Sequence, residues 1–387
     1  PQELAFDNDG NLFTGDNNSD SGDQARWVYV VQDCDTGWRM YFQYLDDRGP
    51  WNRERIWYPW QADAETTEVQ PASTLPPIAN LGNGPSGLAF YPGTGLSDRY
   101  DDHFFLVDFR GGSANSGIWS FGLSPKGASF EVADKHEYLW SILATDLDSA
   151  ADGSLLVSDW VNGWDGEGKG RLYRFRDEAA SGGMAMEVTR LLTTPLEDMS
   201  DAALADLLSH VDRRVRQRAQ FALVGRGAVT SLEQAASSTN ETVAKHGIWG
   251  LWQKGLEGVN EAISVTATLH DLLLAEGDAN PLSEESQTQV LRVAADLWQR
   301  HAIADLPAPV RQLMAGASRG RLASENLRLA GFAALSAGVF GEVAMAEDLL
   351  AFLDRLANTD PVARHQAVMG LVHLAERHPK LLETLAS

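Results

Sequence analysis

The fold of the N-terminal part is decided by the stretch LAFDNDGNLFTGD, residues 4–16. It consists of a short apolar run, an Asp-Gly turn, a second apolar run and a terminal aspartate, Asp16. Asp-Gly between two apolar runs is a strong signal for a tight β-hairpin. Similar units occupy residues 87–108 and 146–159, and each of them also ends in an aspartate. The sequence therefore predicts repeated antiparallel strand pairs.

These strand pairs are typical of β-propeller blades, which repeat at roughly 40–50 residues. Two of the units continue into a third apolar strand, at residues 117–121 and 170–175. Residues 1–176 hold three or four such units, whereas propellers normally have at least four blades. We therefore expect the C-terminal blades of a larger propeller of the six-bladed type, with earlier blades upstream of Pro1.

A different repeat begins after residues 177–199, which are small, polar and Gly-rich and are predicted to form a linker. Its copies share apolar residues at helical spacing and cover residues 215–223, 243–251, 291–297, 327–335 and 363–371. A small residue one turn before a leucine, as in Gly247 and Leu251, predicts close helix contacts. The Asp-Pro pair at 360–361 fits an N-cap followed by proline at the first helical position. The pattern indicates a HEAT-like α-solenoid over residues 200–387.

The amino-acid composition limits which kinds of molecule the chain is expected to bind. The 387 residues carry a net charge of −23, so the chain should repel phosphate backbones, and nucleic-acid binding is not expected. Cys34 is the single cysteine, which excludes an internal disulfide and a cysteine-based metal site. No apolar run reaches the ~20 residues that a membrane span requires. Because the chain starts at Pro1 in a strand-like stretch, we expect the natural N-terminus to lie upstream.

The richest polar stretch is GDNNSDSGD, residues 15–23. It offers carboxylate, amide and carbonyl oxygens, which are the ligands that Ca²⁺ prefers. The spacing is not that of an EF-hand, because no glutamate closes a twelve-residue loop. The same residue types also form ordinary turns without a metal. Both readings remain open from the residues alone.

Three aspartates, Asp16, Asp108 and Asp159, each end the second strand of a predicted unit. In a propeller these strand ends lie on one face, so the carboxylates could surround a central site. Arg110 and Trp160 follow closely, and together they would form a cup for a planar or sugar-like ligand. The alternative is that strand-ending aspartates simply cap turns. Under the first interpretation Asp108, Arg110, Asp159 and Trp160 are candidate cofactor-binding residues.

Other chemistry-bearing residues point less clearly to a site. His103 precedes a predicted strand and His136 lies in a predicted polar connection, so packing or surface exposure is preferred over catalysis for both. The same holds for the histidines of the helical repeats. The tryptophan-rich stretch RGPWNRERIWYPW, residues 48–60, could stack sugar rings, although packing between blades is the preferred interpretation. No Gly-x-Ser-x-Gly elbow, phosphate loop or His-Glu-x-x-His motif is present.

Several strings resemble the soluble PQQ-dependent glucose/sorbosone dehydrogenase propellers. The region from ELAF at 3–6 to GDN at 15–17, GDQ at 22–24 and TGW at 36–38 is similar to their calcium loop. The order of the two parts resembles bacterial multidomain proteins, common in planctomycetes and verrucomicrobia, in which such a propeller precedes HEAT repeats and often a haem-binding C-x-x-C-H domain. Strings that support this wider resemblance are PSGLAF at 85–90, VDFRGG at 107–112, VSDW at 157–160, GKGRLYR at 168–174 and RQRAQFAL at 216–223.

The resemblance implies a set of site residues. Asp16, Asn17, Asn18 and Asp23 match the calcium loop, and Arg110 lies near the position at which the family presents a cation to PQQ. There are two departures. Leu143 and Thr145 stand where the family carries a pair of arginines, and the family's catalytic histidine belongs to a blade that would lie upstream. The resemblance therefore implies Ca²⁺ binding, allows PQQ, places haem c in a domain outside this chain, and implies that this chain alone is inactive.

Three functions follow. The first is a calcium-dependent, PQQ-type dehydrogenase of sugars or polyols, in which a histidine takes the hydroxyl proton as hydride moves to the quinone. The second is a non-catalytic carbohydrate- or protein-binding propeller with a solenoid that docks a protein partner. The third is a calcium-dependent lactonase-type hydrolase on the same scaffold. The resemblance implies a periplasmic or secreted location.

Overall fold

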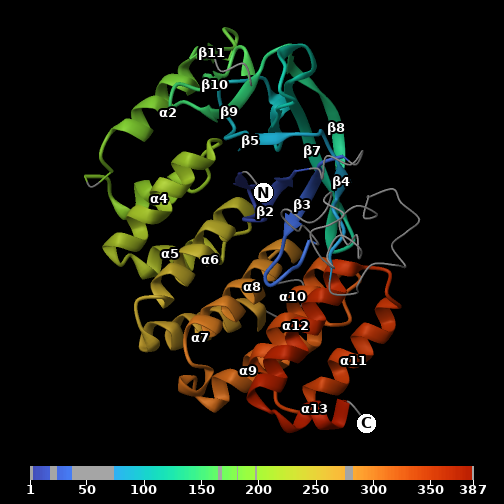
Figure 1. The fold of residues 1–387 in the computed structure, drawn as a ribbon. Helices are drawn as coiled ribbons and strands as arrows, with labels where there is room; N and C mark the ends of the chain where they lie inside the picture. The colour runs from blue at the N-terminus through green and yellow to red at the C-terminus, as the bar shows by residue number, and fades with distance from the viewer. Residues whose placement is uncertain are drawn as a thin grey trace, which may run out of the picture. The chain divides into compact units, whose positions relative to one another are not determined.

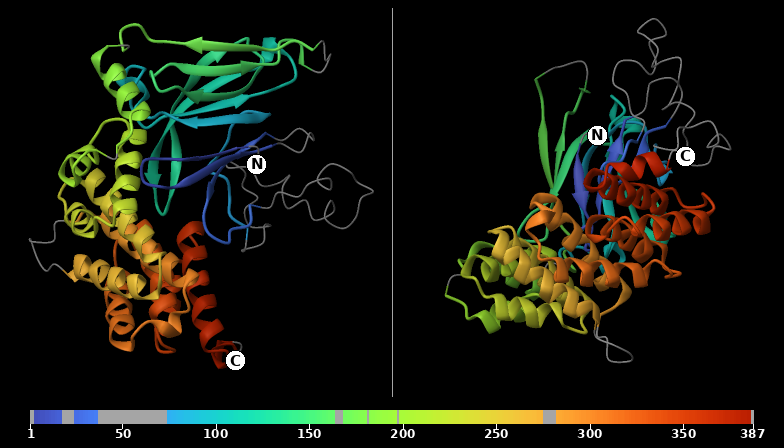
Figure 2. Two further views of the ribbon diagram at one scale, coloured as in Figure 1. Left: turned by 90° about the vertical axis from the view of Figure 1, so that its left-hand side faces the viewer. Right: turned by 90° about the horizontal axis from the view of Figure 1, so that it is seen from below.

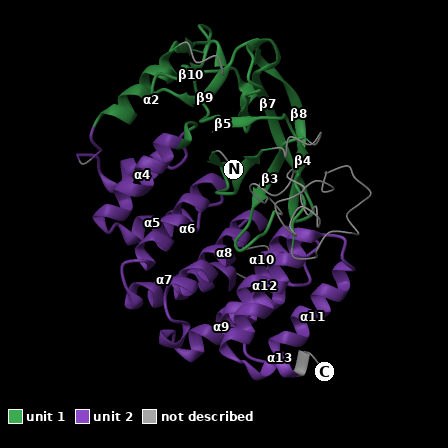
Figure 3. Cartoon of the chain, in the orientation of Figure 1, with its two compact units in different colours: residues 1–194, 211–213 green, residues 195–210, 214–387 purple. Residues whose placement is uncertain are grey.

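The computed structural model describes residues 3–17, 24–36, 74–163, 168–180, 182–196, 198–274 and 282–385 (Figure 1). The chain divides into two compact units (Figure 3). The first comprises residues 1–194 and Val211–Arg213, and the second comprises residues 195–210 and 214–387. The predicted order, a β-rich part followed by a helical part, is confirmed.

The described strands of the first unit form three antiparallel sheets. Each sheet takes its strands in chain order from one edge to the other, as β1–β4, β5–β8 and β9–β11. The strands are β1 (Leu4–Phe6), β2 (Leu12–Asp16), β3 (Arg26–Val30), β4 (Ala79–Asn80), β5 (Pro85–Phe90), β6 (Phe104–Asp108), β7 (Gly117–Lys126), β8 (Ser129–Trp140), β9 (Ala144–Ser149), β10 (Leu155–Asp159) and β11 (Arg171–Phe175). Within the described ranges these sheets close neither a barrel nor a complete propeller.

The predicted hairpin at residues 4–16 is present. Strands β1 and β2 pair with Phe6 opposite Leu12. Asp7 Oδ1 accepts hydrogen bonds from the amides of Asp9 and Asn11, each at 2.8 Å. Gly10 adopts φ +72°, a conformation that glycine reaches without steric cost. Turn chemistry encoded within five residues therefore sets this register.

Aromatic side chains fill the space between the first two sheets. Phe13 of β2 stacks on Trp27 of β3 with ring centroids 5.5 Å apart, and both rings meet Phe104 of β6 edge to face. Phe13 and Trp27 are completely buried. Removing rings of this size from water contributes about 2–3 kcal/mol each. A second cluster, which includes Val107, Leu147 and Val157, joins the sheets that follow.

The first strands of the three sheets contact one another in order, β1 with β5 and β5 with β9. Gly87 of β5 permits the second contact, since a Cβ there would lie 2.6 Å from the Cα of Asp146. The first strands of the three sheets therefore lie next to one another, and residues from distant parts of the chain become neighbours.

Two sequence predictions for the first unit are wrong. Residues 129–140, which include His136, form strand β8 rather than a polar connection. The predicted linker at 177–199 contains helix α2 (Gly183–Thr193), which buries Val188 and Leu191. Gly182 and Gly183 at the start of this helix suggested a linker, although the residues that follow have an apolar face of ordinary helical spacing.

The second unit consists of paired helices. Their bounds are α3 (Asp201–Leu207), α4 (Arg213–Arg226), α5 (Val229–Ala236), α6 (Glu241–Gly255), α7 (Val259–Leu274), α8 (Glu284–Arg300), α9 (Ala308–Arg321), α10 (Leu327–Phe340), α11 (Met345–Leu356), α12 (Pro361–Arg377) and α13 (Lys380–Leu385). In both views of Figure 2 the colour passes in order from yellow through orange to red across this unit, so helices close in sequence are neighbours in space.

The helices form two layers. Helices α6, α8, α10 and α12 contact one another in succession, while α3 contacts α5 and α7 contacts α9. The predicted repeat segments lie within α4, α6, α8, α10 and α12, which are alternate helices of the series. Gly247 permits the close approach of α6 to α5, since a Cβ there would lie 2.2 Å from the Ala236 amide nitrogen. Asp360 caps α12 as predicted, because its side chain accepts from the Ala363 amide at 2.8 Å. Across the described helices, none has the length and apolarity that a bilayer crossing requires.

Candidate functional site

In each described sheet of the first unit, the first two strands are antiparallel, so the first strand begins beside the end of the second. Pro85 at the start of β5 pairs with Asp108 at the end of β6, and Ala144 at the start of β9 pairs with Asp159 at the end of β10. Leu4 likewise pairs with Thr14, close to Asp16. The predicted strand-end aspartates therefore lie where the first strands begin.

Asp108 is fully buried and receives five hydrogen bonds. Oδ1 accepts from the amides of Asn83 and Gly84, at 2.9 and 3.0 Å. Oδ2 accepts from Nε and Nη2 of Arg110, at 3.0 and 2.6 Å, and from Nε1 of Trp119 at 3.0 Å. Burial works to raise the pKa of Asp108, but the donors, led by Arg110, outweigh it and hold the pKa below its ordinary value. These contacts make Asp108 an anchor for the surrounding loop.

Arg110 is the exposed end of a row of cations and aromatic rings. Its guanidinium lies 5.9 Å from the Trp140 ring centroid, and Trp140 meets Trp119 at 4.9 Å. Lys135 Nζ lies 4.2 Å from the Trp119 ring centroid. Partial burial is the main reason that the pKa of Lys135 is lowered, and nearby Arg110 lowers it further. Half-buried tryptophan faces flanked by cations are a surface on which a sugar ring can stack.

The described part of the predicted calcium loop is small. Asp16 is buried, and its Oδ2 lies 3.4 Å from Arg26 Nη2 and accepts from Thr36 Oγ1 at 3.0 Å. Asn17 follows it at the end of β2 and is partly buried. Asn18 and Asp23 lie outside the described residues. The four-residue calcium site therefore stays a prediction.

Asp159 and Trp160 are held by their own loop. Asp159 Oδ1 accepts from the Val161 amide at 2.9 Å, and its Oδ2 lies 3.6 Å from Arg171 Nη1 of the neighbouring strand. The Trp160 ring is 36% exposed and stacks on Phe109 at 5.6 Å. Thus the loops after β6 and β10 meet through aromatic rings. The three predicted aspartates are each engaged by donors near their own strands.

A carboxyl group for which the sequence carried no signal lies at the same end of the sheets. Glu3, just before β1, accepts from the Leu88 amide of β5 at 2.6 Å through Oε2. Its carboxyl group also shares a hydrogen bond with Asp146 of β9, and Asp148 adds a second negative charge nearby. Asp146 Oδ1 accepts from the Leu147 amide at 2.7 Å. The Glu3–Asp146 pair therefore joins the first strands of all three described sheets.

The pair can exchange a proton near neutral pH. Burial is the largest cause that raises the pKa of Glu3, to about 7 from 4.5, and the charges of Asp146 and Asp148 raise it further against the lowering effect of the Leu88 amide. A second carboxyl group in contact disfavours ionisation, so Glu3 keeps its proton to a higher pH than an isolated glutamate does. Asp146 is exposed to solvent, so a ligand can reach the pair. This arrangement is suited to general acid–base chemistry.

Replacing Glu3 by glutamine should remove a pH dependence of stability. The folded state binds this proton more tightly than the unfolded chain, so the stabilisation is complete below pH 4.5 and is lost as the pH rises through about 7. We expect the β-rich unit to lose about 1–2 kcal/mol over this interval, after allowance for solvent screening. Carboxyl-carbon NMR titration measures the midpoint, and the resonance missing from E3Q identifies Glu3. A midpoint near 4.5 would contradict the pair, whereas D146N should lower the wild-type midpoint.

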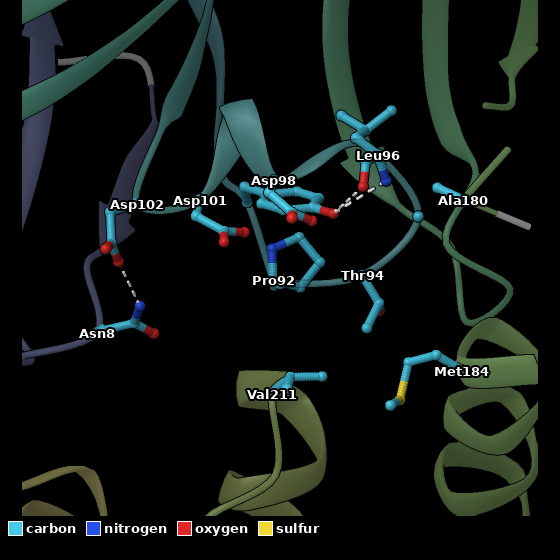
Figure 4. A pocket seen from close by; sticks show the side chains of 13 residues that line it. Asn8, Pro92, Thr94, Leu96, Asp98, Asp101, Asp102, Ala180, Met184 and Val211 are labelled. Atoms are coloured by element: carbon cyan, nitrogen blue, oxygen red, sulfur yellow. Dashed lines mark hydrogen bonds between the residues drawn. The ribbon is translucent and has the colours of Figure 1, made fainter.

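A cavity of about 590 Å³ lies at the opposite end of the sheets, where β1 turns into β2 and β5 connects to β6. Figure 4 shows Asp98, Asp101 and Asp102 beside it, with Asn8 donating to Asp102 at 2.7 Å. Burial, together with the charges of Asp98 and Asp102, raises the pKa of Asp101. Three neighbouring carboxyl groups would repel an anionic cofactor from this cavity.

Comparisons with known proteins identify no relative. Neither family models nor curated proteins match the chain. Among solved structures, the crystal structure of an engineered protein covers 52% of this chain and 85% of its own, with 18% identity and a TM-score of 0.30. A likeness this low carries no argument about fold or function.

Proposed function

We propose that the β-rich unit is a group of β-propeller blades that acts on the hydroxyl group of a sugar or polyol, with the Glu3–Asp146 pair exchanging the proton. The observation that carries this proposal is the hydrogen-bonded carboxyl pair between the first strands of successive sheets. Antiparallel sheets that start at a common inner edge are the arrangement of propeller blades. The helical unit, with its two layers of alternating helices, is proposed to be a HEAT-like solenoid.

Oxidation is the reaction class that the resemblance to sugar dehydrogenases supports. The proton of the substrate hydroxyl would pass to ionised Glu3, whose pKa of about 7 lies close to neutral pH. A hydride acceptor must take the accompanying electrons. The same resemblance supports a periplasmic or secreted location and electron transfer to a haem domain.

The described cofactor candidates, Asp108, Arg110 and Asp159, do not fit PQQ in the family's usual manner. A bound quinone would accept hydride. However, Arg110 directs Nε and Nη2 at Asp108, and all the lone-pair directions of that carboxylate are used by protein donors. Asp159 is likewise held by Val161 and Arg171. We therefore derive no catalytic step through a quinone.

The test is an oxidation assay of the purified chain against aldoses and polyols with a dye acceptor, with and without PQQ and Ca²⁺. We expect kcat/KM to rise with pH through about 7 and to fall by about 100-fold or more in E3Q. D148N, which keeps the hydrogen-bonded pair, should retain most of the activity. Absence of turnover under all of these conditions would refute catalysis by the Glu3–Asp146 pair and would leave the inactivity that the resemblance implies for this chain alone.

A second candidate is a non-catalytic carbohydrate-binding module. It is favoured by the Arg110–Trp140–Trp119–Lys135 row, in which aromatic faces and cations lie together on one sheet. Under this proposal sugars bind without turnover, and W140A weakens their binding in calorimetric titration while E3Q leaves it unchanged. The solenoid would then dock a protein partner.

A further inference from the structure

His103, Asp134 and His136 form a cluster on the second sheet, away from the Glu3–Asp146 pair. One ligand atom from each of the three side chains lies within 4.8 Å of the other two. His103 Nε2 is 3.4 Å from Asp134 Oδ2, and His136 Nδ1 is 3.9 Å from the same oxygen. The imidazole ring centroids are 6.1 Å apart. The three side chains can therefore each offer one nitrogen or oxygen ligand atom within the same small region.

Main-chain carbonyl groups orient both imidazoles. His103 Nδ1 lies 3.0 Å from the Asp101 carbonyl oxygen, and His136 Nδ1 lies 2.9 Å from that of Asp134. A carbonyl accepts only, so the contact of His103 places its ring proton on Nδ1 and its lone pair on Nε2. His103 therefore has the arrangement of a metal-binding histidine, whose second nitrogen donates to a carbonyl or carboxylate. His136 Nδ1 lies near both the Asp134 carbonyl, which accepts, and Arg99 Nη2, which donates, so the carbonyl alone does not set the tautomer of His136.

The Nε2 atoms of both rings are buried and have no hydrogen-bond partner. His103 is only 7% exposed, so water does not readily satisfy its lone pair. Its Nε2 instead faces Asp134 Oδ2 at 3.4 Å. Two acceptors that face each other repel unless a proton or a cation lies between them. A divalent cation would satisfy both groups at once.

The backbone of β8 directs Asp134 toward the histidines. Between the pairs Gly122–Ala133 and Ser120–His136 the register shifts, so Asp134 and Lys135 lie opposite a single residue of β7. This is a β-bulge, a feature that turns a side chain away from its regular direction. Asp134 adopts φ +45°, which is uncommon outside glycine. Among the described strands β8 is the last of its sheet, so Asp134 and His136 lie at the sheet's edge.

We propose that His103, Asp134 and His136 bind a divalent transition-metal ion, with Zn²⁺ as the representative ion. Tetrahedral Zn²⁺ with bonds of about 2.0–2.1 Å places neighbouring ligand atoms about 3.3 Å apart, close to the 3.4 Å between His103 Nε2 and Asp134 Oδ2. Imidazole nitrogen favours Zn²⁺ and its first-row neighbours over Ca²⁺ and Mg²⁺, which prefer oxygen. Three protein ligands leave a coordination position for water or a ligand.

Arg99 competes with the metal. Its Nη2 lies 3.4 Å from both Asp134 oxygens and 3.3 Å from His136 Nδ1, although the side chain is 53% exposed. A guanidinium at this position neutralises Asp134 and repels an incoming cation. Binding therefore requires Arg99 to turn outward, which its exposure allows. The proposal does not depend on the dehydrogenase or the carbohydrate-binding assignment.

The test is calorimetric titration of the full chain with Zn²⁺, and absorption spectroscopy with Co²⁺ as a coloured substitute. We expect one site, and visible Co²⁺ bands of a low-coordinate nitrogen and oxygen ligand set. H136Q and D134N change an edge strand, so they should fold and should each weaken Zn²⁺ binding by about 100-fold, whereas R99Q should strengthen it several-fold.

H365A, which removes a histidine of α12, provides the matched control and should bind Zn²⁺ as the wild type does. Equal Zn²⁺ affinity in the wild type, H136Q and D134N would overturn the proposal, and so would the absence of any stoichiometric binding. H103Q tests the buried ligand, and its circular dichroism spectrum shows whether the fold persists. A folded H103Q with unchanged affinity would also contradict the site.

Discussion

Replacing Asp108 by alanine is expected to lower the free energy of unfolding of the β-rich unit by about 3 kcal/mol, because a buried polar group left without its hydrogen-bond partner costs about 1–3 kcal/mol and Asp108 is the acceptor for several donors. The carboxylate is fully buried and receives hydrogen bonds from two loop amides, Arg110 and Trp119. Alanine leaves these donors without their acceptor and opens a small cavity. The loop at Gly82 should also loosen, since a Cβ added there would lie 3.0 Å from the Asp108 carboxylate.

Hydrogen exchange of the amides in β5, β6 and β7 measures this loss within the β-rich unit, without interference from helix unfolding. D108N is the matched control. Its carboxamide keeps the shape and one acceptor oxygen for the loop amides, but its NH₂ group cannot accept from Arg110, so an intermediate loss is expected. If D108A exchanged as slowly as the wild type, the anchoring role would be wrong and a direct ligand-binding role for Asp108 would regain support.

Replacing Gly338 by alanine is expected to destabilise the helical unit by about 2 kcal/mol. Helices α10 and α12 meet here through their backbones, and a Cβ on Gly338 would lie 2.1 Å from the Gly370 carbonyl oxygen. Backbone atoms cannot rotate away as a flexible side chain can, so the helices must separate. Overpacking of this kind costs about 1–3 kcal/mol, which exceeds the gain of up to about 1 kcal/mol from the better helix propensity of alanine.

Gly316 provides the matched control, because it is an exposed glycine in helix α9, and a Cβ added to it would meet no neighbouring atom within 4 Å. G316A should therefore stabilise the unit by up to about 1 kcal/mol. Urea unfolding followed by far-ultraviolet circular dichroism, which reports on the helices, should move in opposite directions for the two variants. A stabilising G338A would show that α10 and α12 do not approach as closely as described.

Elements specified by neighbouring residues were predictable. The β1–β2 hairpin follows from Asp7 and the Asp-Gly turn, and the start of α12 follows from Asp360-Pro361. Strand β8 was missed because it is an edge strand with many polar side chains, which weakens the apolar signal of a strand. Helix α2 was missed because the two glycines at its start suggested a linker.

The candidate sites were predictable only in part. Sequence placed aspartates at one end of the sheets, and the register agrees. The sequence did not indicate that Arg110 and the loop amides would donate hydrogen bonds to Asp108. An aspartate at the end of a strand gives the same sequence pattern whether or not its oxygens accept hydrogen bonds. The nearest signal for the metal cluster was the Asp134-x-His136 spacing, which puts two ligand types on one strand.

By itself, the sequence determined the β-then-α order, the Asp-Gly hairpin and the alternate helices with small contact residues, because turns, caps and helical spacing act over a few residues. Tertiary structure alone decided which polar groups meet. Glu3 reaches Leu88 and Asp146, and His103 reaches Asp134, across many intervening residues. Such meetings depend on strand register and sheet packing, which the whole apolar core sets together. The strand-end aspartates could therefore be predicted from the sequence. The Glu3–Asp146 pair and the His103–Asp134–His136 cluster could be found only in the folded structure.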